Sequence, residues 1–147
     1  MAEEGAKQTG EVSVKAATQI SVTLDNIPGE LAKIAAALAE AGVNIEGIGR
    51  TVSESKVKEN LVVDNVAAAI KAIEAMGKKV STDEVLHFYY SNDRPGVIAA
   101  IARKLGDDGI NIENMYYAST GRGKAAVVYV AVAKESFEKA LKLAQEV

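Results

Sequence analysis

Residues 25–46 read DNIPGELAKIAAALAEAGVNIE, and residues 92–113 read NDRPGVIAAIARKLGDDGINIE. Ten of the 22 aligned positions are identical without a gap, and matching residues such as Pro28 and Pro95 lie 67 positions apart. Self-similarity at a fixed spacing indicates repeated copies of one structural unit. The fold to be predicted is therefore that of a 67-residue unit, present twice in a chain of 147 residues.

Each copy predicts the same order of elements. A β-type run precedes the Pro-Gly pair, and apolar residues then recur at helical spacing as far as Gly42 or Gly109, which are expected to end the helices in the left-handed conformation. Two more β-type runs and a second helix follow. The predicted strands are residues 20–24, 43–53 and 57–63 in the first copy, and 86–90, 110–119 and 124–132 in the second, with a hairpin-like turn at 120–123.

This β-α-β-β-α order lacks one strand of a βαββαβ ferredoxin-like sandwich. Residues 78–83 can supply that strand to the first copy, but the chain ends at Val147, where the second copy needs its own. The 67-residue spacing places the equivalent segment at residues 11–15, so we predict that this N-terminal strand completes the second unit. The alternative is that the second unit simply lacks a fourth strand.

The predicted fold class is therefore α+β, with two ferredoxin-like βαββαβ sandwiches in tandem, antiparallel sheets and helices on one face. Residues 1–10 are expected to be a disordered lead-in. The first unit is predicted at 11–77, completed by the strand 78–83, and the second at 78–147, completed by the strand 11–15.

The composition argues against several classes of function. There is no Cys and only one His, so thiol chemistry is excluded and the sequence predicts a protein that is not an enzyme and has no cofactor and no metal site. His87 is expected to be packed and hydrogen-bonded. The net charge of −3 gives no reason to expect binding to nucleic acid or membranes, and the cytoplasm is the expected location.

The strand at 86–90 carries apolar residues on both faces. Leu86, Phe88 and Tyr90 share one face, while Tyr89 lies beside His87 on the other. A strand with one wet face would alternate apolar and polar residues. Because helices cover only one face, we expect a second molecule to cover the other, and therefore a homo-oligomer.

The turns before the first helix of each copy are the candidate binding sites. A helix N-terminus presents unpaired amides and partial positive charge, which suit a carboxylate. Oxygens from Asp25 and Asn26, or from Asn92 and Asp93, can cap those amides or receive an ammonium group. The combination is complementary to a zwitterion such as a free amino acid. The same pattern is also a good helix start without any ligand.

The strings DNIPGELAKI…AGVNIE and NDRPGVIAAI…DGINIE resemble the ACT domain, a regulatory module, over almost all of residues 11–147. The resemblance implies binding of small molecules, usually amino acids, where paired domains meet, and regulation of a separate partner enzyme. It also implies contacts from the turn before the first helix and from the start of the second strand. These residues are Asn26, Ile27, Pro28, Gly29, Glu30 and Asn44 in the first copy, and Asn92, Asp93, Arg94, Pro95, Gly96, Val97 and Asn111 in the second.

The two turns differ in their side chains. Arg94 aligns with Ile27, Val97 aligns with Glu30, and all seven aromatic residues fall in the second copy. An arginine can pair with a carboxylate, so we expect the second turn to bind a ligand and the first to bind weakly or not at all. We expect Tyr129 and Phe137 to be core or interface residues. For Tyr116 and Tyr117, a core role and a ligand-contacting role both stay open.

Two other functions remain as alternatives. RNA-recognition motifs share the order of elements, and residues 122–129 partly match their third-strand signature, but Lys124 and Ala126 stand where base-stacking rings are needed. A ligand-free structural dimerisation module or enzyme subunit is the second alternative. The sequence favours a regulatory protein that binds an amino acid or a related small metabolite.

Overall fold

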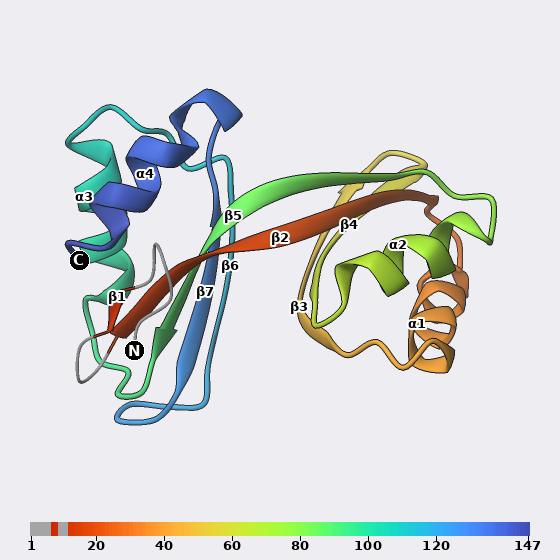
Figure 1. Ribbon diagram of the computed structural model, residues 1–147, viewed down its shortest axis with the longest axis horizontal. Helices are drawn as coiled ribbons and strands as arrows, with labels where there is room; N and C mark the ends of the chain where they lie inside the picture. The colour runs from red at the N-terminus through yellow and green to blue at the C-terminus, as the bar shows by residue number, and fades with distance from the viewer. Residues whose placement is uncertain (1–6, 9–11) are drawn as a thin grey trace. The chain divides into compact units, whose positions relative to one another are not determined.

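The computed structural model describes Lys7, Gln8 and residues 12–147 (Figure 1). The chain divides into two compact units. The first unit is Thr18–Asp83, and the second combines Glu84–Val147 with the N-terminal segment that ends at Ala17. Both boundaries fall inside long strands, so each unit receives part of β2 (Val12–Asp25) and part of β5 (Val80–Tyr90).

In chain order the elements are β1 (Lys7–Gln8), β2 (Val12–Asp25), α1 (Glu30–Glu40), β3 (Ile45–Ser53), β4 (Lys56–Val63), α2 (Val66–Glu74), β5 (Val80–Tyr90), α3 (Val97–Gly106), β6 (Asn114–Ser119), β7 (Ala126–Ala131), a short 3-10 helix (Lys134–Ser136) and α4 (Phe137–Ala144).

In the first unit, the antiparallel strands run in the order β3-β4-β2. The register pairs Ile20 and Ile48 with Leu61. Alternate residues of these strands face α1 and α2, which cover one side of the sheet (Figure 1). The core forms where Leu61 meets Ile34 and Leu38 of α1 and Ile73 of α2, all at most 1% exposed.

In the second unit, β5, β7 and β6 are antiparallel neighbours in that order, and α3 and α4 cover one side (Figure 1). Leu86 and Phe88 pack with Ile101 of α3 and Ala140 of α4 in one buried cluster. Val14 of β2 belongs to this same cluster and is 0% exposed. The N-terminal part of β2 therefore contributes to the core of the second unit.

The fold class predicted from the sequence is confirmed: antiparallel strands and four α-helices make up the described α+β chain. Some strands differ from the prediction. The described part of the segment predicted as 11–15, from residue 12, forms the single strand β2 together with residues 20–24. The segment predicted as 78–83 is strand only from residue 80, and it forms β5 together with residues 86–90. Most of the expected lead-in 1–10 lies outside the described residues. Its described part, Lys7–Gln8, forms β1 and pairs with β2, where no strand was predicted.

In both copies the helix begins two residues after the proline, at Glu30 and at Val97. The residues at the N-cap are Gly29 and Gly96, with φ of +92° and +99°. Proline cannot adopt that left-handed conformation because its ring fixes φ near −65°, so each proline stands one residue earlier. At the other helix ends, Gly42 and Gly109 have φ of +74°, which confirms their predicted left-handed conformation.

The side chains of β5 lie on both faces of the second unit's sheet. Leu86, Phe88 and Tyr90 are buried under the helices, whereas Tyr89 on the other face is 43% exposed. His87 stacks on Tyr129 at 4.6 Å between ring centroids. The expectation of a hydrogen-bonded histidine is wrong for Nε2, which is buried without a partner among the described residues. Burial lowers the pKa of His87 to about 4, so the packed ring is neutral.

Tyr129 and Phe137, which were expected to be core or interface residues, are buried at 3% and 8% exposure. Tyr116 packs against Tyr129, with 5.1 Å between ring centroids. Cross-strand pairing of Tyr116 with Tyr129 and of Tyr117 with Val128 puts the two adjacent tyrosines on opposite faces. Only Tyr117 therefore reaches the side on which α3 begins.

Val14→Ala tests the contribution of β2 to the second unit. Loss of two buried methyl groups should lower the free energy of unfolding by about 2 kcal/mol, and amide protection should fall more in β7 and α4 than in β4 and α2. Ser13→Ala, one residue away and only half-buried, is the matched control. Equal effects of the two substitutions, measured by denaturant unfolding and hydrogen exchange, would contradict this packing.

Candidate functional site

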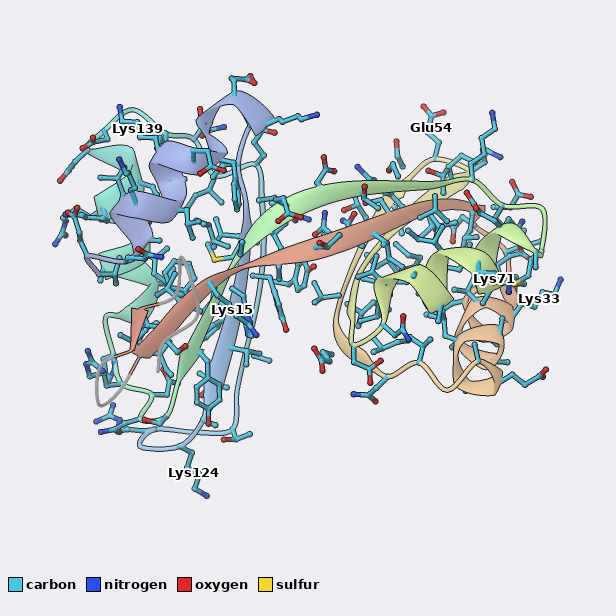
Figure 2. All side chains as sticks on the ribbon, in the orientation of Figure 1. Lys15, Lys33, Glu54, Lys71, Lys124 and Lys139 are labelled. Atoms are coloured by element: carbon cyan, nitrogen blue, oxygen red, sulfur yellow. The ribbon has the colours of Figure 1, made fainter. Side chains whose placement is uncertain are left out.

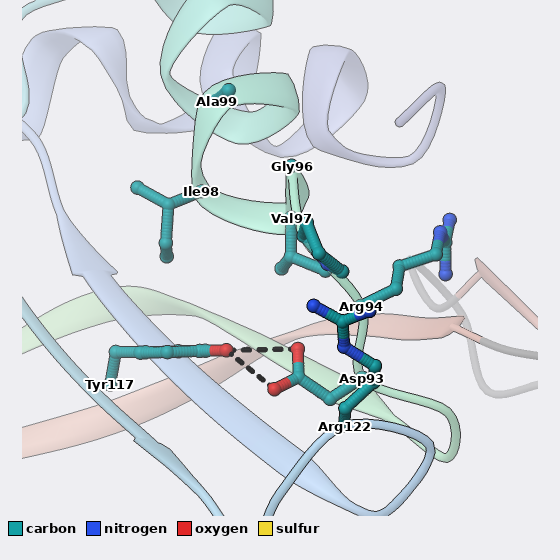
Figure 3. Close-up of a pocket in the computed structure, with 9 residues that line it drawn as sticks. Asp93, Arg94, Gly96, Val97, Ile98, Ala99, Tyr117 and Arg122 are labelled. Carbon is teal, nitrogen blue, oxygen red and sulfur yellow. Dashed lines mark hydrogen bonds between the residues drawn. The ribbon is translucent and has the colours of Figure 1, made fainter.

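A pocket lies at the helix-opening turn of the second unit (Figure 3). Its volume is about 380 Å³. The turn, the first residues of α3, a tyrosine of β6 and the β6–β7 hairpin all contribute to it. The lining residues are Asp93, Arg94, Pro95, Gly96, Val97, Ile98, Ala99, Tyr117 and Arg122.

The amides at the start of α3 are available to a ligand. The first intrahelical hydrogen bond runs from the Ala100 amide to the Gly96 carbonyl, at 2.9 Å. The amides of Val97, Ile98 and Ala99 precede it, and no described side chain caps the helix at Gly96. These three residues line the pocket, so unpaired donors and the positive end of the helix dipole lie beside it.

The expectation that Asn92 or Asp93 caps this helix is not met, because the Asp93 carboxylate is held elsewhere. The Tyr117 hydroxyl donates to both carboxylate oxygens, at 2.9 and 3.0 Å (Figure 3), and the Ser119 hydroxyl donates to Oδ2. The hydrogen bond from Ser119, and next that from Tyr117, holds the pKa of Asp93 below its usual value. Asp93 is therefore a fixed negative charge on the pocket wall.

The β6–β7 hairpin holds the helix-opening turn in place through two backbone hydrogen bonds. The Asp93 amide donates to the Lys124 carbonyl at 2.8 Å, and the Gly123 amide donates back to the Asp93 carbonyl at 2.7 Å. Gly123 adopts φ of +79°, a conformation that favours glycine. This pair of backbone hydrogen bonds holds Arg122 beside the start of α3.

Arg122 is a candidate functional residue that sequence reasoning missed. The sequence analysis places it in a hairpin turn and in the partial RNA-recognition signature, and nothing in the local pattern connects it with a helix that begins at Val97. Figure 3 shows its side chain rising from the hairpin toward the helix start. The Arg94 side chain extends away from the Tyr117–Asp93 pair in the same view, and its Nη1 lies 3.4 Å from the Asn92 carbonyl oxygen.

The first helix-opening turn has different side chains around the same backbone. Ile27, which aligns with Arg94, is 58% exposed. Glu30, which aligns with Val97, is buried in the first turn of α1 and pairs with Lys33 at 3.1 Å and Lys78 at 3.4 Å. A carboxylate of the protein itself therefore already lies near the positive end of α1. Asn26 and Pro28 complete this turn before Gly29, and the Asn26 amide donates to the Ser55 carbonyl at 2.8 Å.

Asn44 and Asn111 do not lie beside the turn of their own unit. The Asn44 amide donates to Asp64, past the end of β4, whereas Asn26 pairs with Ser55 before its beginning. Similarly, Asn111 precedes Glu113, which bonds to Ala131, while Asp93 bonds to Lys124 at the other end of β7. A strand of this length separates its ends by roughly 20 Å. Within one unit, therefore, no small ligand contacts both predicted groups of residues.

Three other kinds of site find no support among the described residues: a metal centre, a membrane-spanning helix and an RNA-recognition surface. They contain no group of three or more His, Cys, Asp or Glu side chains placed to hold a metal ion. Within the same part of the chain, no helix has the length and apolar character to cross a membrane. Ala126, which would need to be aromatic in an RNA-recognition motif, is 2% exposed within the core.

Comparison with protein families gives two matches to the ACT domain, at residues 18–75 and 88–147. The chain belongs to the ACT domain family. The two matches coincide with the repeated copies, so this protein is a tandem ACT domain protein. No curated protein matches it.

Solved structures share the tandem ACT fold. Protein BT0572 from Bacteroides thetaiotaomicron superposes with a TM-score of 0.80 at 22% identity, over 90% of this chain and 89% of that chain. The ligand-free regulatory subunit of aspartate kinase from Thermus thermophilus superposes with a TM-score of 0.67 at 23% identity, over 95% and 98%. The corresponding subunit from Thermus flavus gives 0.63 at 21% identity, over 95% and 98%. At these identities the likeness concerns the fold.

Tyr117→Phe tests whether the tyrosine hydroxyl holds Asp93 in its charged form. Losing this donor should raise the pKa of Asp93 toward its ordinary value of 3.8, which a carbon-detected NMR titration measures directly. A carboxyl group whose pKa is lower in the folded than in the unfolded state stabilises the fold at pH values above its unfolded-state pKa. The wild type should therefore be more stable than Tyr117→Phe at neutral pH, and this difference in free energy of unfolding should shrink as the pH falls below about 4. Tyr89→Phe is the control, and an unchanged Asp93 pKa in Tyr117→Phe would contradict the assignment.

Proposed function

We propose that this tandem ACT domain protein binds an amino acid or a related small metabolite and regulates a separate partner enzyme. The observation that carries the proposal is the uncapped start of α3, which opens into a pocket beside Arg122. Membership of the ACT family supports it, as does the fold shared with a regulatory subunit of aspartate kinase. We propose the cytoplasm as its location.

The pocket offers complementary groups to a zwitterion. A ligand carboxylate would accept hydrogen bonds from the amides of Val97, Ile98 and Ala99 and pair with the Arg122 guanidinium. An ammonium group would lie toward the negative charge of Asp93. The aliphatic side chain of Ile98 and the ring of Tyr117 leave an apolar wall for the remainder of the ligand.

We propose that the second turn binds more tightly than the first. At the second turn the helix dipole and Arg122 both attract a carboxylate. At the first turn, Glu30 places a carboxylate in the same field, and Ile27 stands in place of an arginine. Glu30 therefore competes with an anionic ligand for the positive end of α1, whereas the first turn of α3 contains no acidic side chain.

Asn44 and Asn111 lie far from the helix-opening turn of their own unit. In a homo-oligomer, the Asn44 or Asn111 of another copy could lie beside that turn. The family resemblance implies sites of this kind where domains pair. Regulation then requires that the ligand binds one assembled or conformational state more tightly than another, since a ligand with equal affinity for both shifts nothing. A partner enzyme would respond to the favoured state.

Thermal denaturation with each of the twenty amino acids tests the proposal. A ligand at about 100 times its dissociation constant should add roughly 2.7 kcal/mol and raise the melting temperature by several degrees. If none of them or of their close metabolites produces a shift, the ligand-free structural module is favoured instead.

Substitutions at the two turns locate the site. Gly96→Ala and Gly29→Ala are a matched pair, because both glycines have positive φ and open space where a Cβ would lie, so both substitutions carry similar backbone strain. Calorimetry should show lost affinity for Gly96→Ala and Arg122→Ala, and nearly unchanged affinity for Gly29→Ala. Equal losses at both glycines would contradict the asymmetry.

A further inference from the structure

A second pocket, of about 600 Å³, lies in the first unit. It is separate from the helix-opening turn of that unit, and it is formed by neighbouring residues of β2 and β4, by the segment that follows α2 and by the start of β5. The lining residues are Ser21, Thr23, Lys58, Gly77, Lys78, Lys79, Val80 and Ser81.

The side chains of this pocket are those of an anion site. Three lysines and three hydroxyl residues line it, and none of the described lining residues is acidic. The first unit as a whole is not basic, because residues 18–83 contain seven Lys and Arg residues and nine Asp and Glu residues. The lysines are therefore gathered locally in an acidic unit.

The cross-strand pairs explain why Lys58 is not neutralised within the protein. On β4, Lys56 faces Asp25 across the strand pair and bonds to it at 2.6 Å. Two residues further, on the same face, Lys58 is flanked by Thr23 on β2 and Thr51 on β3. The sequence thus places an acid beside one lysine and hydroxyl groups on both sides of the next.

The other two lysines differ in their partners. Lys79, like Lys58, takes part in no ion pair among the described residues. Lys78 forms an ion pair with Glu30, at 3.4 Å between Nζ and Oε1. Gly77, with φ of +80°, turns the chain after α2 so that Lys78 and Lys79 follow at once beside the sheet. Like charges that converge on one pocket repel each other, and an anion between them relieves that repulsion.

The floor of the pocket is polar and fixed. Ser21 is 4% exposed, and its hydroxyl donates to Asn60 Oδ1 at 2.7 Å. Asn60 is itself 3% exposed. A buried hydrogen bond of this kind holds the floor in one arrangement, so a ligand would not need to order it.

We infer that this pocket binds a phosphorylated small molecule with two or more negative charges. Lysine ammonium groups act as point charges toward phosphate, and the hydroxyls of Thr23 and Ser81 can donate to its remaining oxygens. Val80 is the one apolar residue among those that line it, so the pocket offers no surface on which a nucleobase would stack. The charge and hydroxyl pattern therefore favours a compact ligand over a nucleic acid.

Titration calorimetry with inorganic pyrophosphate at constant ionic strength tests the inference. The wild type should show saturable binding of one pyrophosphate per chain. Lys58→Gln and Lys79→Gln should each weaken it about tenfold or more, because each removes a charge-assisted hydrogen bond. Lys71→Gln is the matched control, since Lys71 projects from α2 and lies outside the pocket (Figure 2).

Two results of this titration would overturn the inference. The first is that the wild type shows no saturable binding of pyrophosphate. The second is that Lys71→Gln weakens pyrophosphate binding as much as Lys58→Gln and Lys79→Gln do, which would indicate diffuse screening. Tighter, Lys58-dependent binding of single-stranded RNA would identify a polyanion surface instead. Amino-acid binding at the second unit should be the same in Lys58→Gln as in the wild type, so failure of this inference and failure of the proposed function are separable.

Discussion

Asp93 cannot cap α3 while Tyr117 and Ser119 hold its carboxylate, and the candidate site depends on this constraint. An Asx residue close before a helix normally satisfies one of the unpaired amides. Here the hydrogen bonds from β6 keep the carboxylate on the pocket wall, so the helix begins at a glycine with its amides open. The same carboxylate, with its pKa held low, supplies negative charge beside the positive helix end. Opposite charges are thus maintained a short distance apart, which is the pattern that a zwitterion matches.

The two copies have a similar backbone at the helix-opening turn but different side chains around it. At the 67-residue spacing, Arg50 corresponds to Tyr117 and Asn26 to Asp93. Arg50 does not bond to the turn. Its Nη2 lies 2.7 Å from Oε2 of Glu59, a fully buried residue on the neighbouring strand. A buried carboxylate needs such a partner, because an unpaired charge in the core is strongly destabilising. Arg50 is therefore engaged by the buried Glu59, whereas Tyr117 at the corresponding position of the second copy bonds to Asp93 at the pocket.

The sequence predicts the elements well because the repeat fixes their limits twice. Gly42 and Gly109 end their helices in the left-handed conformation that the pattern indicates. Of the apolar positions at helical spacing, Ile34 and Leu38 of α1 and Ile101 and Leu105 of α3 are buried in the cores. Cross-strand and cross-element contacts are less visible in a linear pattern. The joining of two predicted runs into β2, and of two into β5, follows from pairing along the whole strand.

The site was only partly predictable for the same reason. Pro95, Gly96 and Val97 are adjacent in the chain and could be named from a motif. Arg122 reaches the helix start only through the backbone hydrogen bonds between Asp93 and the hairpin, which no local pattern encodes. The position of Asp93 before the helix indicated a capping role. Its hydrogen bond with Tyr117 depends on the register of β6 and β7, which the order of residues along the chain does not show.

The most direct test of the central claim is to follow individual backbone amides on ligand binding. Nitrogen–proton NMR spectra would be recorded with the amino acid or metabolite that stabilises the protein most. The amide resonances of Val97, Ile98 and Ala99 should shift with saturation, while those of Leu31 and Ala32 at the start of α1 should change little. If that ligand binds and leaves the three α3 amides unmoved, the open helix start is not the binding site.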